Sequence, residues 1–161
     1  MCCITLLRTG LRSGEFLALT ADCVVEIGGS HWLRVPIGKM RRDRYIPLHA
    51  EVKALLERWI AHRQPERPTD FLFTRYGRSI GHGSVQRAVA DIAHRAGIPR
   101  HVTPHQLRHT LATLAINRGM ALERIAALLG HRSLSMTLVY AHIGQHTLQE
   151  EYHCRHCSNW A

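Results

Sequence analysis

The sequence predicts an α+β domain that is mainly helical and carries one small three-stranded antiparallel sheet. Three observations predict this class. Segments of β type, separated by turn residues, are confined to residues 23–48. Apolar residues recur at helical spacing before that region and after it. Glycine or proline stands where each helical pattern stops. With 161 residues, 45% of them hydrophobic, the chain is long enough to bury a core.

The three strands are expected from their turn signals. Residues 23–27 lead into Gly28-Gly29-Ser30, which is typical of a tight hairpin turn. Residues 31–37 then predict a second strand, and after a turn over residues 38–43 a third strand is expected at residues 44–48.

The helices are expected from apolar periodicity and from their end signals. Residues 1–19 read as mostly helical, with Gly10 and Gly14 breaking the pattern. Thr103-Pro104 is a strong helix start, because threonine caps a first turn and proline suits its first position. The later helices are expected over residues 50–62, 83–97, 104–118, 122–129 and 133–141.

The charge is strongly basic and carried by arginine. Lys+Arg is 21 against 12 for Asp+Glu, which gives a formal net charge of +9, and all but Lys39 and Lys53 of the basic residues are arginines. This excludes an acidic, disordered or collagen-like chain and favours an anionic partner, nucleic acid first. No apolar run approaches the roughly 20 residues of a membrane span, so no membrane partner is expected. Five cysteines form a poor disulfide framework, which predicts a reduced, cytoplasmic compartment.

The helix expected over residues 104–118 has two distinct faces. Its leucines lie on one side at about 100° per residue, which leaves that side free to pack. Three polar residues share the adjoining arc: His105, Arg108 and His109. One arginine and two histidines therefore look outward together.

Five short motifs stand in a fixed order along the chain. They are Thr9-Gly10-Leu11-Arg12 with Glu15 three positions on, Lys39 between two strands, His105-Gln106-Leu107-Arg108-His109, Leu129-Gly130-His131, and Tyr140 nine residues after His131. In this order and spacing they resemble the tyrosine recombinase (phage integrase) family. The resemblance covers about residues 5–152 and implies the tyrosine-recombinase catalytic-domain fold.

The resemblance implies a role for each motif. Arg12 and Arg108 would clamp the scissile phosphate, since the planar guanidinium fork matches two phosphate oxygens and keeps its proton. His131 would donate a hydrogen bond to a phosphate oxygen. Glu15 and His109 would support the site, Glu15 by orienting Arg12 or a nearby histidine.

Tyr140 would be the nucleophile that forms a 3′-phosphotyrosine. A phenol with a pKa near 10 needs help at neutral pH, and His105 could take its proton as general base. Lys39 would act as the general acid that protonates the 5′-hydroxyl leaving group. The covalent intermediate stores the energy of the broken bond, so the mechanism implies no metal, ATP or other cofactor.

The expected partner is double-stranded DNA, with self-association on it, because the family works as a tetrameric synapse. Four further arginines are expected to contact DNA: Arg41, Arg42, Arg44 and Arg132. We expect residues 1–152 to be the catalytic domain of a site-specific recombinase or integrase. The family's N-terminal DNA-clamping domain is absent in this reading, and residues 153–161 form a divergent, disordered tail.

Two other classes remain open. A DNA-binding helix-turn-helix module without catalysis is suggested by residues 122–133. A zinc site is suggested by His105 and His109 at i, i+4, or by Cys154 and Cys157 at ligand spacing. The zinc reading is weaker, because Gln106 replaces the expected glutamate and no second Cys/His pair follows Cys157 at a suitable distance.

Overall fold

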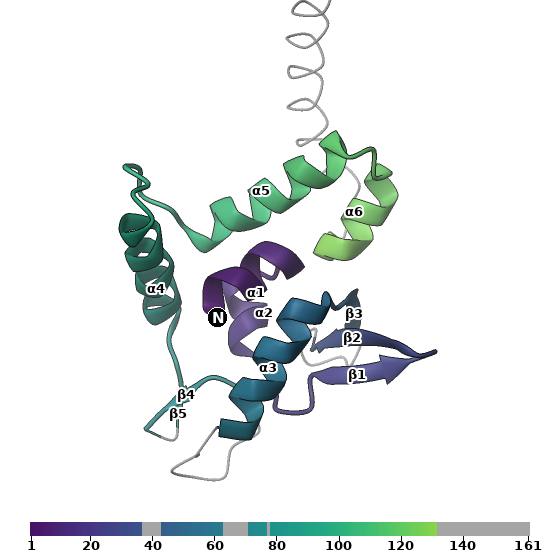
Figure 1. Ribbon diagram of the computed structural model, residues 1–161, viewed down its shortest axis with the longest axis horizontal. Coiled ribbons are helices and arrows are strands. Elements are labelled where there is room, and N and C mark those ends of the chain that lie inside the picture. The colour runs from purple at the N-terminus through teal and green to yellow at the C-terminus, as the bar shows by residue number, and fades with distance from the viewer. Residues whose placement is uncertain (37–42, 63–70, 77, 132–161) are drawn as a thin grey trace, which may run out of the picture. The chain divides into compact units, whose positions relative to one another are not determined.

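The computed structural model describes residues 1–36, 43–62, 71–76 and 78–131. The chain divides into two compact units, Met1–Arg108 and His109–Ala161, and the division falls within α5. The predicted class is confirmed: the fold is mainly helical with one three-stranded antiparallel sheet (Figure 1). In chain order the described elements are α1 (Cys2–Thr9), α2 (Ser13–Leu17), β1 (Val24–Ile27), β2 (Ser30–Val35), β3 (Arg44–Pro47), α3 (Ala50–His62), β4 (Thr74–Arg75), β5 (Arg78–Ser79), α4 (His82–Arg95), α5 (Pro104–Asn117) and α6 (Leu122–Leu129).

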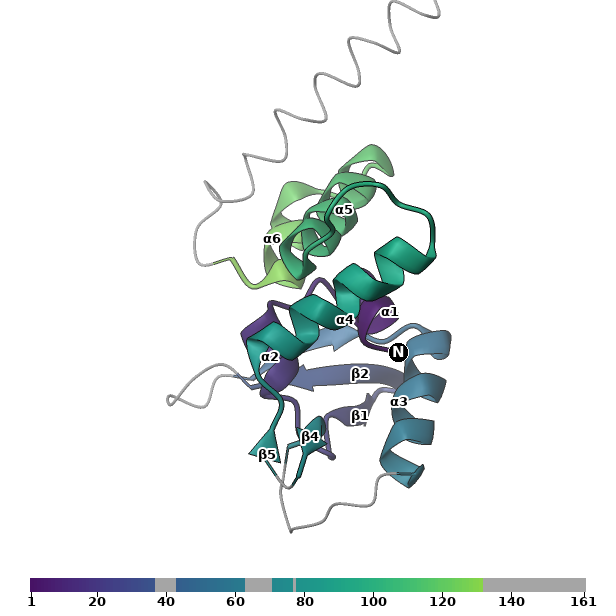
Figure 2. The same ribbon diagram turned by 90° about the vertical axis from the view of Figure 1, so that its left-hand side faces the viewer.

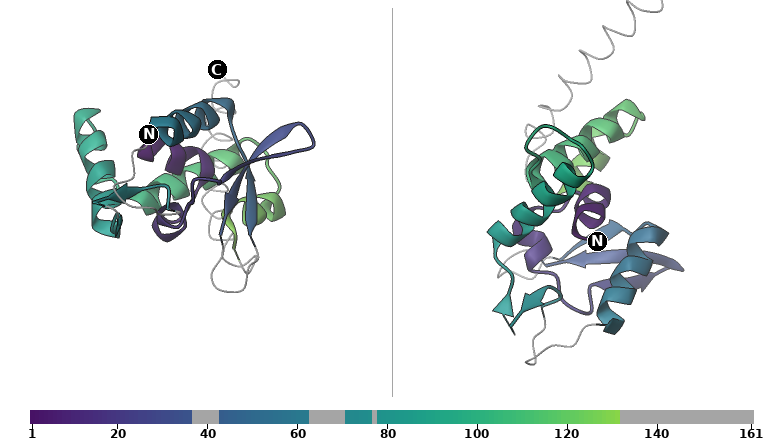
Figure 3. Two further views of the ribbon diagram at one scale, coloured as in Figure 1. Left: turned by 90° about the horizontal axis from the view of Figure 1, so that it is seen from below. Right: turned by 60° about the vertical axis from the view of Figure 1, so that its left-hand side comes forward.

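The three predicted strands form one sheet in the order β1-β2-β3, with both pairs antiparallel. Ile27 pairs with Ser30, which leaves Gly28 and Gly29 as a two-residue turn. Both glycines have positive φ, 58° and 74°, as the favoured hairpin turn requires. The tip of this hairpin stands clear of α1 and α3 (Figure 3).

The turn glycine at position 29 offers a clean stability test. Gly29→Ala is expected to lower the free energy of unfolding by about 1–2 kcal/mol, because an alanine at φ 74° is strained even where its Cβ meets nothing. Gly83→Ala in α4 is the matched control, since its Cβ also meets nothing but its φ is ordinary. That control should stabilise by up to about 1 kcal/mol. Urea unfolding measures both, and equal effects of the two substitutions would contradict the assignment.

The N-terminal helices depart from prediction at one glycine. Gly10 ends α1 as expected, with φ 63° and its N–H donating to the Leu6 carbonyl at 2.9 Å. Gly14, however, lies inside α2, so the prediction that it breaks the helix is wrong. The reason is local: the Glu15 carboxylate accepts the backbone N–H of Arg12 at 2.8 Å and closes the first turn. This bond offsets the low helix propensity of glycine.

The first unit holds the three-stranded sheet, helices α1 to α4 and the start of α5. Helix α3 contacts β1, while α1 contacts both α3 and α4, and α2 contacts α4 (Figure 2). The Phe16 and Phe73 rings stack at 4.2 Å between centroids. The largest fully buried side chains of this unit are Phe16, Leu6, Leu11, Leu19, Leu33, Ile46, Leu56, Leu72, Val35 and Val52. The sheet and the helices of this unit thus both contribute buried apolar side chains to its interior.

Two small β features were not predicted. Strands β4 and β5 pair as a two-residue ladder, and Thr20 forms an isolated bridge with Phe71. Strands this short and polar carry no period-2 pattern that a sequence could reveal. They extend the loop that joins α3 to α4.

Helix α5 begins as predicted. Thr103 Oγ1 accepts the Gln106 backbone N–H at 3.3 Å, and the Gln106 side chain accepts the Thr103 N–H at 2.8 Å, a reciprocal capping box. In the second unit, α6 runs over the predicted residues 122–129. The helix expected over residues 133–141 lies outside the described residues.

The second unit has a small core of its own. Ala112 and Ala115 of α5 pack against Ile125 and Leu129 of α6, and Leu111 and Ile116 lie against the same cluster. Within the described ranges, no helix is both long enough and apolar enough to cross a membrane.

Candidate functional site

The segment from Gly10 to Arg12 is the centre of the candidate site. Gly10 turns the chain in the left-handed conformation, Leu11 is fully buried, and Arg12 begins α2 as its N-cap. Within the Thr-Gly-Leu-Arg motif, Gly10 therefore ends α1, Leu11 packs into the core, and Arg12 caps the start of α2. The motif places an arginine, whose side chain is 43% exposed, at the N-terminus of α2.

Glu15 holds Arg12 at two points. Its Oε2 accepts the Arg12 backbone N–H at 2.8 Å, and its Oε1 accepts the Arg12 Nη1 at 3.0 Å. One carboxylate thus fixes both the main chain and the guanidinium of the same residue. The predicted position of Glu15 beside Arg12 is what the structure shows.

Arg44 completes this cluster in a way the sequence did not indicate. It was expected among the DNA-contacting arginines, but its side chain is only 8% exposed, and its Nη2 lies 2.9 Å from Glu15 Oε2. Burial lowers the pKa of Arg44, the Glu15 carboxylate opposes that shift, and the nearby Arg12 charge adds to it. Two guanidinium groups, those of Arg12 and Arg44, therefore share the Glu15 carboxylate.

Arg108 reaches the same segment from α5. It is 3% exposed, and its Nη1 donates a hydrogen bond to the carbonyl oxygen of Gly10. That carbonyl lies at the C-terminal end of α1, where the helix dipole favours a cation. The structure therefore links the two arginines predicted to clamp a phosphate: Arg108 bonds the carbonyl of Gly10, and Arg12 follows Gly10 by two positions.

The three predicted histidines occupy different settings. His105 is exposed in the first turn of α5. His109 is half-buried, and the Thr113 hydroxyl donates to its carbonyl at 3.1 Å. His131 is half-buried directly after Gly130, which has φ 66°.

The Leu-Gly-His motif has a defined backbone structure. The Gly130 N–H donates to the Ala127 carbonyl at 3.2 Å, and the His131 N–H donates to the Ala126 carbonyl at 3.0 Å. This is the Schellman arrangement, in which a left-handed glycine ends a helix. The backbone position of His131 is therefore set by the end of α6.

The remaining predicted residues lie outside the described ranges: Lys39, Arg41, Arg42, Arg132 and Tyr140, together with Cys154 and Cys157. Across the part of the chain that the structure describes, no three His, Cys, Asp or Glu side chains are grouped so that they could hold a metal ion. The i, i+4 pair of His105 and His109 therefore has no third ligand there.

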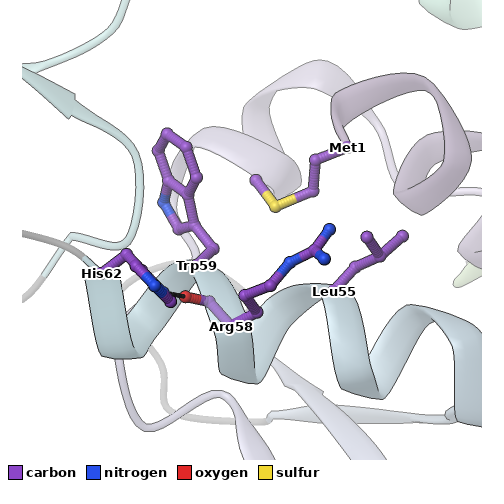
Figure 4. A pocket seen from close by; sticks show the side chains of 5 residues that line it. All are labelled: Met1, Leu55, Arg58, Trp59 and His62. Carbon is purple, nitrogen blue, oxygen red and sulfur yellow. Dashed lines mark hydrogen bonds between the residues drawn. The ribbon is translucent and has the colours of Figure 1, made fainter.

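Two cavities in the first unit lie apart from the charged cluster. One, of about 340 Å³, is lined by Met1, Leu55, Arg58, Trp59 and His62 (Figure 4). A second, of about 370 Å³, is mainly apolar and includes the side chains of Phe16, Trp59 and Phe73. Neither is lined by a predicted site residue.

The chain matches a family model described as the phage integrase family over residues 2–146. It is 33% identical to the tyrosine recombinase XerC of Chlamydia pneumoniae over 139 residues, which cover 84% of this chain and 44% of the relative. It is also 33% identical to XerC of Lactobacillus leichmannii over 150 residues, which cover 89% and 50%. The chain thus spans about half the length of these curated relatives.

Two solved structures are similar in fold. The XerH site-specific recombinase bound to a palindromic difH substrate in a post-cleavage complex matches with a TM-score of 0.82 and 28% identity, over 94% of this chain and 44% of that one. The XerA recombinase matches with a TM-score of 0.75 and 33% identity, over 94% and 55%.

Proposed function

Because this chain belongs to the phage integrase family and has the catalytic-domain fold of tyrosine recombinases, we propose that it breaks and rejoins DNA strands as a site-specific recombinase. One observation carries the proposal. Arg108 bonds the Gly10 carbonyl, two residues before Arg12 in the chain, and the Arg12 guanidinium is held by Glu15. Two positioned guanidinium groups can bind an anionic phosphodiester and stabilise the charge that it gains during attack.

The arginines act on the charge of the phosphate. A phosphodiester gains negative charge on its non-bridging oxygens during attack, and catalysis is largely positioning and stabilisation of that charge. Arg12 presents a half-exposed guanidinium held by Glu15, and Arg108 supplies a second one braced on Gly10. Pre-set donors of this kind need no rearrangement at the moment of reaction.

The covalent step uses residues from the five ordered motifs. Tyr140 Oη forms a bond to phosphorus, and the bond from phosphorus to the 5′-oxygen breaks. His105 takes the tyrosine proton, and Lys39 gives a proton to the 5′-oxygen. His131 donates a hydrogen bond to a phosphate oxygen, and His109 supports the site.

The reverse step rejoins the strand. A 5′-hydroxyl from the same or another duplex attacks the phosphotyrosine and releases Tyr140. Residues 1–152 form the catalytic half of such an enzyme, which acts on double-stranded DNA in the cytoplasm and assembles on it with further copies. Arg41, Arg42 and Arg132 contact the DNA backbone.

The test is a trapped covalent complex. The chain is incubated with a random-sequence pool of duplexes that carry nicks, so that cleavage releases a short strand and cannot reverse. We expect a protein–DNA band that survives denaturant, and Tyr140→Phe is expected to abolish it because phenylalanine has no attacking oxygen. Tyr76→Phe, at an exposed tyrosine, is the matched control and should leave the band unchanged.

The same experiment separates the rival function. A helix-turn-helix module without catalysis would shift the DNA in a native gel and yield no denaturant-resistant band. Binding that loses affinity steeply with salt, together with an adduct that depends on Tyr140, supports the recombinase.

A further inference from the structure

We propose that Arg44 is a positioning residue that holds Glu15, and through it Arg12, in the orientation that a phosphodiester needs. The inference rests on the proposed function for its catalytic consequence, while its structural claim concerns this chain alone. It removes Arg44 from the DNA-contacting arginines.

The first step is the direction of the Arg44 side chain. In β3 the residues alternate: Arg44 and Ile46 are buried, whereas Tyr45 and Pro47 are exposed. Arg44 also pairs in register with Val35 of β2, which is fully buried. The arginine therefore points to the inner face of the sheet, where an apolar residue would be expected.

The second step is what the buried charge contacts. Its Nη2 lies 2.9 Å from Glu15 Oε2, the same oxygen that accepts the Arg12 backbone N–H at 2.8 Å. The other oxygen of that carboxylate lies 3.0 Å from Arg12 Nη1. Exposure rises outward along the series, from 8% at Arg44 to 15% at Glu15 and 43% at Arg12. Arg44 is thus the buried end of the series, and Arg12 is its solvent-exposed end.

The third step is the mechanical consequence. Without Arg44, the Glu15 carboxylate would keep its bonds to the Arg12 backbone N–H and guanidinium, both within its own helix start. Arg44 ties the same carboxylate to the sheet, more than two dozen positions away in sequence. The orientation of Arg12 is thereby coupled to β3, and loss of Arg44 leaves the carboxylate with no bond to the sheet.

The catalytic arm of the test separates positioning from DNA contact. Arg44→Met is expected to slow single-turnover adduct formation by about 10²-fold, the effect of a misplacement near 1 Å. Its DNA affinity should stay at the parent value, and so should the slope of log affinity against log salt concentration. Loss of a phosphate contact would instead reduce the magnitude of that slope by about 0.9. Arg44→Lys keeps the charge and should recover part of the rate. A weakened, less salt-dependent affinity would instead make Arg44 a DNA contact and overturn the proposal.

The matched control is Arg34→Met. Arg34 lies on β2 and pairs with Asp22 and Asp43 rather than with Glu15, so its loss removes an arginine of the same sheet and leaves the bonds of Glu15 in place. Its adduct formation should match that of the parent chain. If Arg34→Met is as slow as Arg44→Met, the effect is a general loss of sheet integrity, and the proposal fails.

A spectroscopic arm stands independently of activity. In the ¹⁵N-labelled full chain, the Arg12 side-chain Nε–Hε signal is assigned by its loss in Arg12→Lys. That signal is expected to shift and to lose its restricted rotation in Arg44→Met, and to change little in Arg34→Met. An Arg12 signal unmoved in Arg44→Met and Arg44→Lys overturns the proposal. If the signal moves but the parent chain forms no adduct, the positioning link holds and the proposed function fails.

Discussion

Arg108→Lys is expected to slow formation of the covalent DNA complex by about 10²–10³-fold, the cost of losing one preorganised donor at the reacting charge. Lysine keeps the positive charge but replaces a planar fork with a point donor. Arg108 already uses one N–H on the Gly10 carbonyl, so it needs several donors in fixed geometry to bind a phosphate as well. Single-turnover cleavage of the trapped substrate measures the effect.

The control for Arg108 is Arg118→Lys, at an exposed residue just after the end of α5. It makes the same chemical change without a tie to Gly10 and should cleave at the parent rate. Cleavage by Arg108→Lys within about threefold of the parent rate would show that the fork is not used in the transition state.

Glu15→Ala is expected to lower the free energy of unfolding by about 3–5 kcal/mol, because it leaves a buried guanidinium without its counter-charge. Arg44 would remain at 8% exposure without the Glu15 carboxylate, and the positive charge of Arg12 lies close by. Urea unfolding followed by circular dichroism gives the difference. The double variant Glu15→Gln with Arg44→Met should recover part of the loss, since it removes the buried guanidinium as well.

The control for Glu15 is Glu51→Ala. Glu51 pairs with Arg8 at 3.6 Å, and both side chains are 49% exposed, so solvent already screens the pair. Its loss should change stability by no more than about 1 kcal/mol. If Glu15→Ala costs no more than Glu51→Ala, the buried cluster does not stabilise the fold.

The elements that the sequence predicted well are those whose ends are chemically marked. Gly10, Gly119 and Gly130 all adopt positive φ at the ends of helices, and Thr103 caps the start of another. Such signals are local, so one sequence suffices to find them. The short strands β4 and β5 are defined by their pairing with each other in the folded chain, so no local sequence signal marks their ends.

The candidate site residues were predicted one by one, without the contacts that join them. Arg12, Glu15 and Arg108 were proposed from motif order, and their roles stay predictions. The burial of Arg44 was not predicted. Arg41-Arg42-Asp43-Arg44 looks like part of a solvated loop, because four charged residues in succession suggest exposure to water. The available signal was the alternation of Arg44 with Ile46 on one face of a strand, which predicts an inward side chain.

The hydrogen bond from Arg108 to the Gly10 carbonyl has a consequence for the order in which the chain folds. The two residues are 98 positions apart, so their contact closes a long loop and carries the entropy cost of doing so. During synthesis the sheet and the N-terminal helices emerge from the ribosome before residue 108 exists. A growing chain can therefore assemble the interior around the sheet while the partner of the Gly10 carbonyl is still unmade. The tie between α5 and the end of α1 forms only after that interior exists.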